Sequence, residues 1–259
     1  MPQTKPYKKT FLKQVIFRVD FAEFLDNELL SEEALAPLLT KLKIRGITQE
    51  YHEDTGSMQI DAQGNLVVAK SERKAGRIIS FSNTSDENTN TVKISNKFII
   101  GDFMKYSSSR DAFSIIDLAL ETYYKIATVN TTRIGLRYIN TYPESDIKLN
   151  QSFFNGKIKN SLSMPLPQSK YIKSLVSSLS KDEYFFDDIH LNVRYGWLRN
   201  NASIQAGPRR FTLDFDCYSQ DTYGSYSTIL DFIKIAYSHI ETIFEEAITE
   251  KMRSVMNEN

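Results

Sequence analysis

The chain has 259 residues, of which 41% are hydrophobic and 25% are charged, and its 32 basic residues balance 32 acidic ones. This length permits one large domain or two small ones, and the composition is typical of a globular protein with a substantial core. The net charge of zero argues against a dedicated duplex-binding domain, because such domains are usually basic, although a local nucleic-acid contact stays possible.

The cysteine content and the distribution of apolar residues indicate the cellular compartment. Cys217 is the only cysteine, which excludes an intrachain disulfide and a cysteine-rich zinc site. The N-terminal residues lack the apolar segment of a signal peptide, and no stretch approaches the roughly 18 apolar residues that a membrane helix needs. We therefore expect a cytoplasmic protein that makes no membrane contact.

The first half of the chain is predicted to contain several strands and two helices. Apolar residues at every second position predict strands, and apolar residues three or four positions apart predict helices. The strands are expected at 15–21, 47–54, 66–69, 77–81 and 91–103, the last as one strand or two. The helices are expected at 31–43 and 110–127. Pro37 should make the first helix start late or kink, because proline does not fit a helix interior.

A central strand is predicted at 131–142, where T-T-R-I-G-L-R-Y-I-N-T-Y alternates clearly. Ile134, Leu136 and Tyr138 alternate there with Arg133, Gly135 and Arg137. One face should enter the core, and the other should carry two arginines with a glycine between them. A glycine inside a strand often marks a bulge or a close backbone approach.

The second half is less regular. The segment 144–182 gives little periodic signal, and 171–179 within it fits either a helix or a strand, of which we favour the strand. A strand at 184–195 and its antiparallel partner at 209–218 follow, joined by a long turn. The pattern at 225–256 contains no glycine or proline and predicts one long C-terminal helix, or two helices with a slight bend.

Together these elements predict an α+β fold: a mostly antiparallel, twisted sheet with helices packed on one face and a long C-terminal helix. We expect a flexible arm at 1–12, where two prolines occur among lysines, and a single domain at 13–259. Two subdomains at 13–143 and 144–259 are the alternative. The segments 98–126 and 211–240 both read as a strand, a polar break and a helix, which reflects either a duplication or shared patterning alone.

No catalytic constellation is found in the sequence. It contains no nucleophile elbow, P-loop or dinucleotide-binding glycine pattern, and its three histidines do not have a metal-ligand spacing. The aspartates beside Cys217 should raise its thiol pKa, which argues against a nucleophile. We therefore predict no catalytic residue, no metal site and no cofactor.

The strongest candidate for a binding surface is the polar side of the predicted sheet. Charged residues lie opposite the apolar face of several strands, namely Arg18, Asp20, Arg133, Arg137, Arg194, Asp214 and Asp216. They could form cross-strand ion pairs on a solvated face, or the arginines could grip a carboxylate or phosphate with their planar forks.

The only tryptophan follows one of these arginines. Trp197 lies in the segment R-Y-G-W-L-R-N, which suits a protein contact, a base-stacking platform or a half-buried aromatic corner. Five residues are thus the candidate binding residues: Arg133, Arg137, Asn140, Arg194 and Trp197.

Three segments carry a family resemblance. They are V-I-F-R-V-D-F at 15–21, R-I-G-L-R-Y-I-N at 133–140 with the helix before it, and L-D-F-D at 213–216 with the final helix around 239–249. Across nearly its whole length the chain resembles an uncharacterised, sporadically distributed prokaryotic protein family with an R-x-G-L-R-Y-I-N signature. That family has no assigned activity, and its patchy distribution is similar to that of mobile or host-defence genes.

Two functions are consistent with these observations. The first is a non-catalytic binding or accessory protein with a protein partner, such as an antitoxin-like component of a prokaryotic defence cassette, in which a homo-oligomer is also possible. The alternative is a metal-dependent hydrolase, a nuclease or phosphoesterase, that acts on a phosphate-containing substrate. It would use Asp and Glu ligands, with Arg133 or Arg137 steadying the phosphate.

Overall fold

A computed structural model describes residues 7–26, 28–31, 33–42, 46–60, 66–82, 90–104, 109–143, 151–162, 177–199 and 209–258. In chain order the elements are β1 (Leu12–Phe21), α1 (Ala36–Leu42), β2 (Gly46–Ile60), β3 (Leu66–Ser82), β4 (Asn90–Ser95), β5 (Phe98–Phe103), α2 (Ser109–Ile126), β6 (Thr131–Pro143), η1 (Gln151–Phe153), α3 (Gly156–Ser161), β7 (Ser177–Phe186), β8 (Ile189–Arg199), β9 (Arg209–Ser219), α4 (Tyr226–Ala247) and α5 (Glu250–Asn257).

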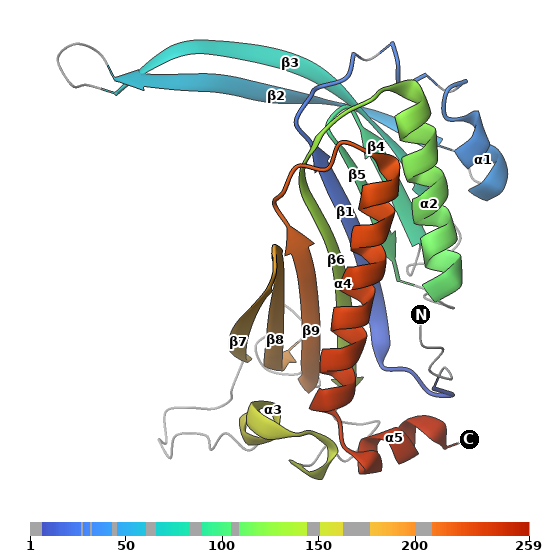
Figure 1. Ribbon diagram of the computed structural model, residues 1–259, viewed down its shortest axis with the longest axis vertical. Coiled ribbons are helices and arrows are strands. Elements are labelled where there is room, and N and C mark those ends of the chain that lie inside the picture. Colours follow the sequence, from blue (N-terminus) through green and yellow to red (C-terminus); the bar gives the residue numbers. More distant parts are fainter. Residues whose placement is uncertain are drawn as a thin grey trace.

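The described strands form one nine-stranded sheet in the order β2-β3-β4-β5-β1-β6-β9-β8-β7 (Figure 1). Every pairing between neighbours is antiparallel. The predicted central strand 131–142 corresponds to β6, which lies in the interior of the sheet between β1 and β9. Helices α2 and α4 lie side by side against one face, which confirms the predicted α+β class.

Alternate residues of the middle strands build the core beneath these two helices. The sheet contributes Val15, Phe17, Val19, Ile134, Leu136, Leu213 and Phe215, and the helices contribute Ile116, Leu120, Tyr123, Ile229, Phe232 and Ala236. Phe113 of α2 meets Tyr237 of α4 edge to face at 5.5 Å, so the helices also pack on each other. We call this side the helix-covered face.

The expected subdomains share this sheet. β6, from the first half, pairs with β9, from the second, along most of its length, from Ile134 to Pro143. The units β5–α2 and β9–α4 both have the predicted strand-then-helix form, and both helices cover the same face (Figure 1). Whether the two units arose by duplication stays a prediction.

The predicted arm needs correction over residues 7–12. Phe11 is buried, and its carbonyl oxygen accepts a hydrogen bond from the backbone N–H of Thr141 at 2.8 Å. Tyr7 donates from its hydroxyl to Glu245 at 2.7 Å, and the N–H of Lys9 bonds to the carbonyl oxygen of Met256. The apolar side chains of this segment complete the end of the core, whereas residues 1–6 lie outside the described part.

Two helix predictions are refined. The first helix begins at Ala36, so Pro37 falls in its first turn, where an N–H would have no helical partner anyway. The C-terminal segment is divided into α4 and α5, because Ile248 leaves the helix to form a β-bridge with Phe154. The hydroxyl of Thr249 then caps α5 by accepting from the N–H of Met252.

Two strand predictions are wrong. The single strand expected at 184–195 is a tight β7–β8 hairpin, which turns at Asp187 with a positive φ of 47°. Aspartate tolerates this left-handed conformation better than most residues. The two short strands expected at 66–69 and 77–81 are one strand, β3. The strand expected at 171–179 is described only from Ser177 onward.

Within the described residues, none of the helices combines the length and the apolar character that crossing a membrane would require.

Candidate recognition surface on the open face of the sheet

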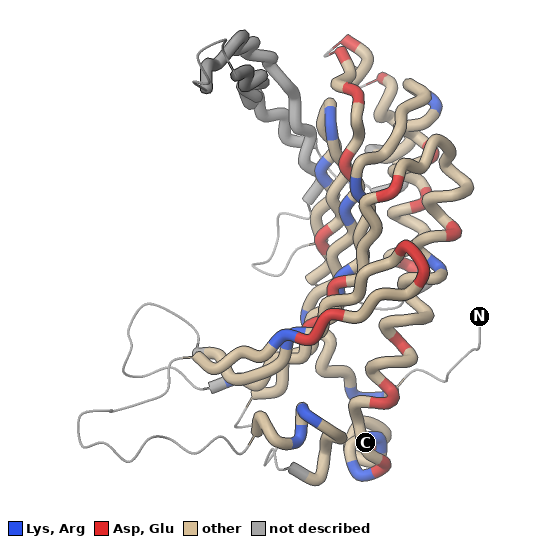
Figure 2. The backbone as a smooth tube through the Cα atoms, turned by 60° about the vertical axis from the view of Figure 1, so that its left-hand side comes forward, with Lys and Arg blue, Asp and Glu red and all other residues tan. Residues whose placement is uncertain are grey.

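The face of the sheet opposite α2 and α4 has no described helix over it, and we call it the open face (Figure 1). Side chains of paired residues in adjacent strands point to the same side, so the strand register defines this face. It carries Arg18 and Asp20 of β1, Arg133 and Arg137 of β6, Asp214, Asp216 and Tyr218 of β9, His190, Asn192 and Arg194 of β8, and Lys181, Glu183 and Phe185 of β7. Figure 2 shows basic and acidic positions mixed along these strands.

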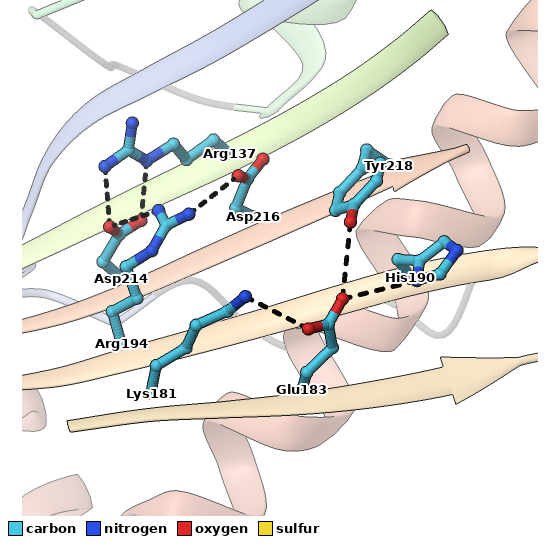
Figure 3. Close-up of polar contacts among 8 residues, drawn as sticks. All are labelled: Arg137, Lys181, Glu183, His190, Arg194, Asp214, Asp216 and Tyr218. Atoms are coloured by element: carbon cyan, nitrogen blue, oxygen red, sulfur yellow. Dashed lines mark hydrogen bonds and ion pairs between the residues drawn. The ribbon is translucent and has the colours of Figure 1, made fainter. Parts of the chain in front are cut away.

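An ion-pair network occupies the middle of the open face (Figure 3). Arg137 donates two hydrogen bonds to Asp214 from one edge of its guanidinium, from Nε to Oδ1 at 2.8 Å and from Nη2 to Oδ2 at 2.7 Å. Arg194 lies opposite Asp214 in the register and reaches its Oδ2 at 3.3 Å, and it also reaches Asp216 at 3.4 Å. These carboxylates therefore already have cationic partners within the chain.

The burial of Asp214 gives this ion-pair network a role in the stability of the fold. The side chain of Asp214 is only 6% exposed, so its negative charge depends on the two guanidinium groups that replace its water. The hydrogen bonds with Asp214 in turn raise the pKa of Arg137 above its ordinary value. Of the two interpretations of the charged face, cross-strand ion pairing accounts for Arg137 and Arg194.

Arg133 makes different contacts from Arg137, the other arginine of β6. Its guanidinium lies over the ring of Tyr218, 5.2 Å from the ring centre, and no carboxylate of the described residues pairs with it. Gly135 lies between the two arginines on the same face. A Cβ there would lie 3.4 Å from Cβ of Tyr218 and 3.8 Å from Nη2 of Arg133, which are ordinary contact distances. The expected close backbone approach at this glycine therefore stays a prediction.

Tyr218 begins a row of ring contacts that runs to the edge of the sheet. Its ring stacks on His190 with centres 5.0 Å apart and planes at 9°, and His190 contacts Phe185 at 4.8 Å. We call Arg133, Tyr218, His190 and Phe185 the stacked row. It crosses four neighbouring strands, from β6 to β7.

Glu183 holds two members of the stacked row together with Lys181, in a second group of polar contacts beside the ion-pair network (Figure 3). Its carboxylate pairs with Lys181 at 3.1 Å, accepts from the Tyr218 hydroxyl at 3.4 Å and lies 3.5 Å from Nδ1 of His190. The hydrogen bond from Lys181 is the main reason that the pKa of Glu183 is lowered. Beside it, Asn192 is 4% exposed, and its Oδ1 has no hydrogen-bond partner among the described residues.

The five candidate binding residues lie on opposite faces. Arg133, Arg137 and Arg194 are on the open face. Asn140 is paired with the buried Leu213, bonds to its carbonyl oxygen at 3.4 Å and belongs to the helix-covered face. Trp197 is 8% exposed and meets Phe211 edge to face, so it is a buried aromatic corner. Alternation within 133–140 already separates Asn140 from the arginines, since odd and even positions face opposite sides.

Sequence reasoning missed the other members of the stacked row. Tyr218 and His190 lie at the polar positions of β9 and β8, where period-two alternation does place them on the open face. Their mutual contact depends on the register between the two strands, which no local pattern contains. Alternation does not place Phe185 in this row, because the pattern predicts one strand at 184–195 where the structure has a hairpin.

Other features that could support chemistry are limited within the described part of the chain. No group of three or more His, Cys, Asp or Glu residues there is arranged to hold a metal ion. Burial raises the pKa of the Cys217 thiol to about 12, so it is protonated at neutral pH. A depression of about 640 Å³ lies at the α4–α5 junction, where Arg253 is paired with Glu245 and Glu250.

Comparison with known proteins adds no assignment, since no protein-family model and no curated protein matches this chain.

Proposed function

We propose that the chain is a non-catalytic binding protein that recognises an acidic segment of a protein partner with the open face of its sheet. Arg133 carries this proposal. It is held against the ring of Tyr218, and no described carboxylate pairs with it. The planar fork of an arginine matches the two oxygens of a carboxylate, and a guanidinium that lies over a ring can still donate its N–H groups to them.

The charge balance of the open face favours a protein over a nucleic acid. Arg18 pairs with Asp20, and Arg137 and Arg194 pair with Asp214 and Asp216. A nucleic-acid backbone is bound by cations that neutralise successive phosphates, which needs a surplus of positive charge. A face of mixed sign instead selects a partner by complementary pairs.

The surroundings of Arg133 also suit a protein contact. Tyr218 and His190 provide flat, partly apolar surface next to the guanidinium, and aromatic residues with arginine are the types enriched at the energetic centres of protein interfaces. The partner would place a carboxylate at Arg133 and an apolar side chain over the neighbouring rings. An accessory or antitoxin-like role in a defence cassette is the setting that the family resemblance suggests.

The test is affinity capture from the native host with the neighbouring genes expressed, followed by binding measurements with the recovered partner. Arg133→Ala should weaken binding roughly tenfold to a hundredfold, the range for loss of a hydrogen bond to a charged group. Arg133→Lys should restore only part of the affinity, because lysine lacks the planar fork. Arg18→Ala is the matched control, since Arg18 is on the same face and already paired with Asp20.

Three results would count against the proposal: no partner recovered, equal loss with Arg18→Ala, or full binding by Arg133→Ala. The metal-dependent hydrolase is tested separately by calorimetric titration with magnesium, manganese and zinc. Heat of binding to any of them, together with hydrolysis of a phosphate ester, would favour the alternative.

A further inference from the structure

We infer that two copies of this chain associate through the outer edges of their β7 strands and form one continuous antiparallel sheet. The inference goes beyond the proposed function, because Arg133 lies on β6, three strands away from this edge. Three features of β7 support the inference: its unpaired outer edge, its exposed apolar side chains, and its complementarity to a second copy related by a two-fold axis.

The outer edge of β7 is open for pairing. β7 is the last strand in the sheet order, and among the described residues no strand pairs with its outer side. Its ten residues pair with β8 from Ser177 to Phe186 without a register shift, so the strand has no bulge that would turn the edge away. Proline, which would also block pairing, is absent from it.

The side chains of β7 are unusually apolar for a solvent-facing edge. Leu179 is 54% exposed and Phe185 is 63% exposed, and both point to the open face. Tyr184 is exposed as well, so three of the six exposed large hydrophobic residues in the described chain belong to this one strand. Exposed apolar groups concentrated on an unpaired edge are typical of a surface that another strand covers.

The sequence of β7 is complementary to itself. A two-fold axis perpendicular to the sheet makes each residue oppose one on the same face of the second copy. If the axis passes between the two copies of Asp182, Lys181 of one copy opposes Glu183 of the other, and Leu179 of one copy opposes Phe185 of the other. The two-fold symmetry makes each of these pairs occur twice. A shift of the axis by one residue would set Lys181 against its own copy or Glu183 against its own copy. Charge therefore selects the register.

Asp182 can occupy the axis because its charge is compensated within each chain. Its carboxylate pairs with Lys157 of α3 at 2.9 Å and accepts from the Tyr195 hydroxyl at 3.1 Å, on the helix-covered face. The remaining opposed residues on that face are serines against Tyr184 and Phe186. The two copies would thus meet without an unpaired charge at the centre.

Charge reversal tests this interface. Sedimentation of the whole chain from about 1 to 100 µM, the range of weak to moderate complexes, should give a species of twice the 29.8 kDa chain mass. Lys181→Glu and Glu183→Lys should each sediment as single chains, because like charges then oppose across the axis. An equimolar mixture of the two variants should restore the dimer, since one copy has two acids and the other has two lysines.

Lys181 and Glu183 also pair with each other within one chain, so each single variant loses that contact too. The mixture does not restore the contact within either chain, so recovery of the dimer would have to come from pairing between chains. Asp182→Cys provides a geometric check. Under oxidation it should link two copies, because opposed Cα atoms lie within disulfide range. Ser180→Cys should not link to itself, since its own copies would lie about 13 Å apart along the strands.

A single-chain mass for the wild type across the whole range would overturn the inference, and so would dimers that survive both charge reversals or Asp182→Cys chains that do not link. None of these results involves the partner of the proposed function. A monomer that still captures its partner through Arg133 would refute the dimer alone, and a dimer that captures nothing would refute the proposed function alone.

Discussion

Ile16 and Phe17 are neighbours on β1 that point to opposite faces of the sheet. Phe17 is fully buried beneath the helices, whereas Ile16 lies half-buried on the open face, opposite Arg137. The helix-covered face is held together by packing and the open face by ion pairs, stacking and hydrogen bonds. The comparison shows that specific contacts within the chain organise the charged face as well as the core.

The difference also explains why two arginines of one strand take different roles. Arg137 is opposite Asp216 in the register and next to Asp214, so it is engaged by acids of β9. Arg133 is opposite Asp20 of β1, but Asp20 pairs with Arg18, and the guanidinium of Arg133 lies over the ring of Tyr218. The contacts of the acids on both neighbouring strands thus distinguish the two arginines.

The largest expected effect is on the helix-covered face. Phe17→Ala should lower the free energy of unfolding by about 4 kcal/mol, because it removes a buried ring and leaves a cavity. Ile16→Ala, its matched control on the open face, should cost only about 1 kcal/mol, because the side chain is half solvated. Chemical denaturation of both variants measures the two losses of unfolding free energy. Equal losses would mean that the open face is as tightly packed as the core.

A smaller effect is expected from Arg137→Ala, at about 2 kcal/mol. Removing one partner of a fully buried pair costs roughly 3–5 kcal/mol, and the partial exposure of Arg137 reduces that figure. The melting temperature should fall by roughly 4–8 °C. Arg133→Ala is the control on the same strand and face, and it should lose under about 1 kcal/mol.

Asp214→Asn sharpens this test. In the double variant with Arg137→Ala, the loss should be smaller than the sum of the two single losses, because no buried carboxylate is left without its main partner. An unchanged melting temperature for Arg137→Ala would show that the ion pair adds nothing to stability. Arg137 would then again be a candidate for partner binding beside Arg133.

The elements that could be predicted from sequence are those that pack one apolar side against the other layer of the fold, sheet against helix. The helix at 110–127 and the strand at 131–142 agree with α2 and β6 within one or two residues, because the sheet–helix interface imposes their periodicity. The hairpin at Asp187 was missed because apolar residues continue on both sides of a two-residue turn. β3 was divided because its middle, 70–76, is polar or small at both odd and even positions.

The candidate site was only partly predictable for a different reason. Alternation does place Arg133, Arg137 and Arg194 on one face, as the structure has them. Their partners depend on which strands are neighbours, and Arg137 and Asp214 are 77 residues apart in the chain. A local pattern shows which side a residue faces but not what it meets there.

The smallest expected effect concerns two buried tyrosines on the helix-covered face. The hydroxyl of Tyr142 has no hydrogen-bond partner among the described residues, and complete burial raises its pKa above the ordinary range. Tyr142→Phe should therefore leave the free energy of unfolding unchanged or raise it by up to about 1 kcal/mol, since it removes an unsatisfied polar group.

Tyr123→Phe is the matched control, because the Tyr123 hydroxyl bonds to the carbonyl oxygen of Asn96 at 3.2 Å in an equally buried site. It should lose about 1 kcal/mol, the net contribution of one hydrogen bond. Urea denaturation of both variants gives the comparison directly. A loss for Tyr142→Phe as large as that for Tyr123→Phe would mean that a buried water or another group satisfies the Tyr142 hydroxyl. The core would then contain a second satisfied tyrosine hydroxyl besides that of Tyr123.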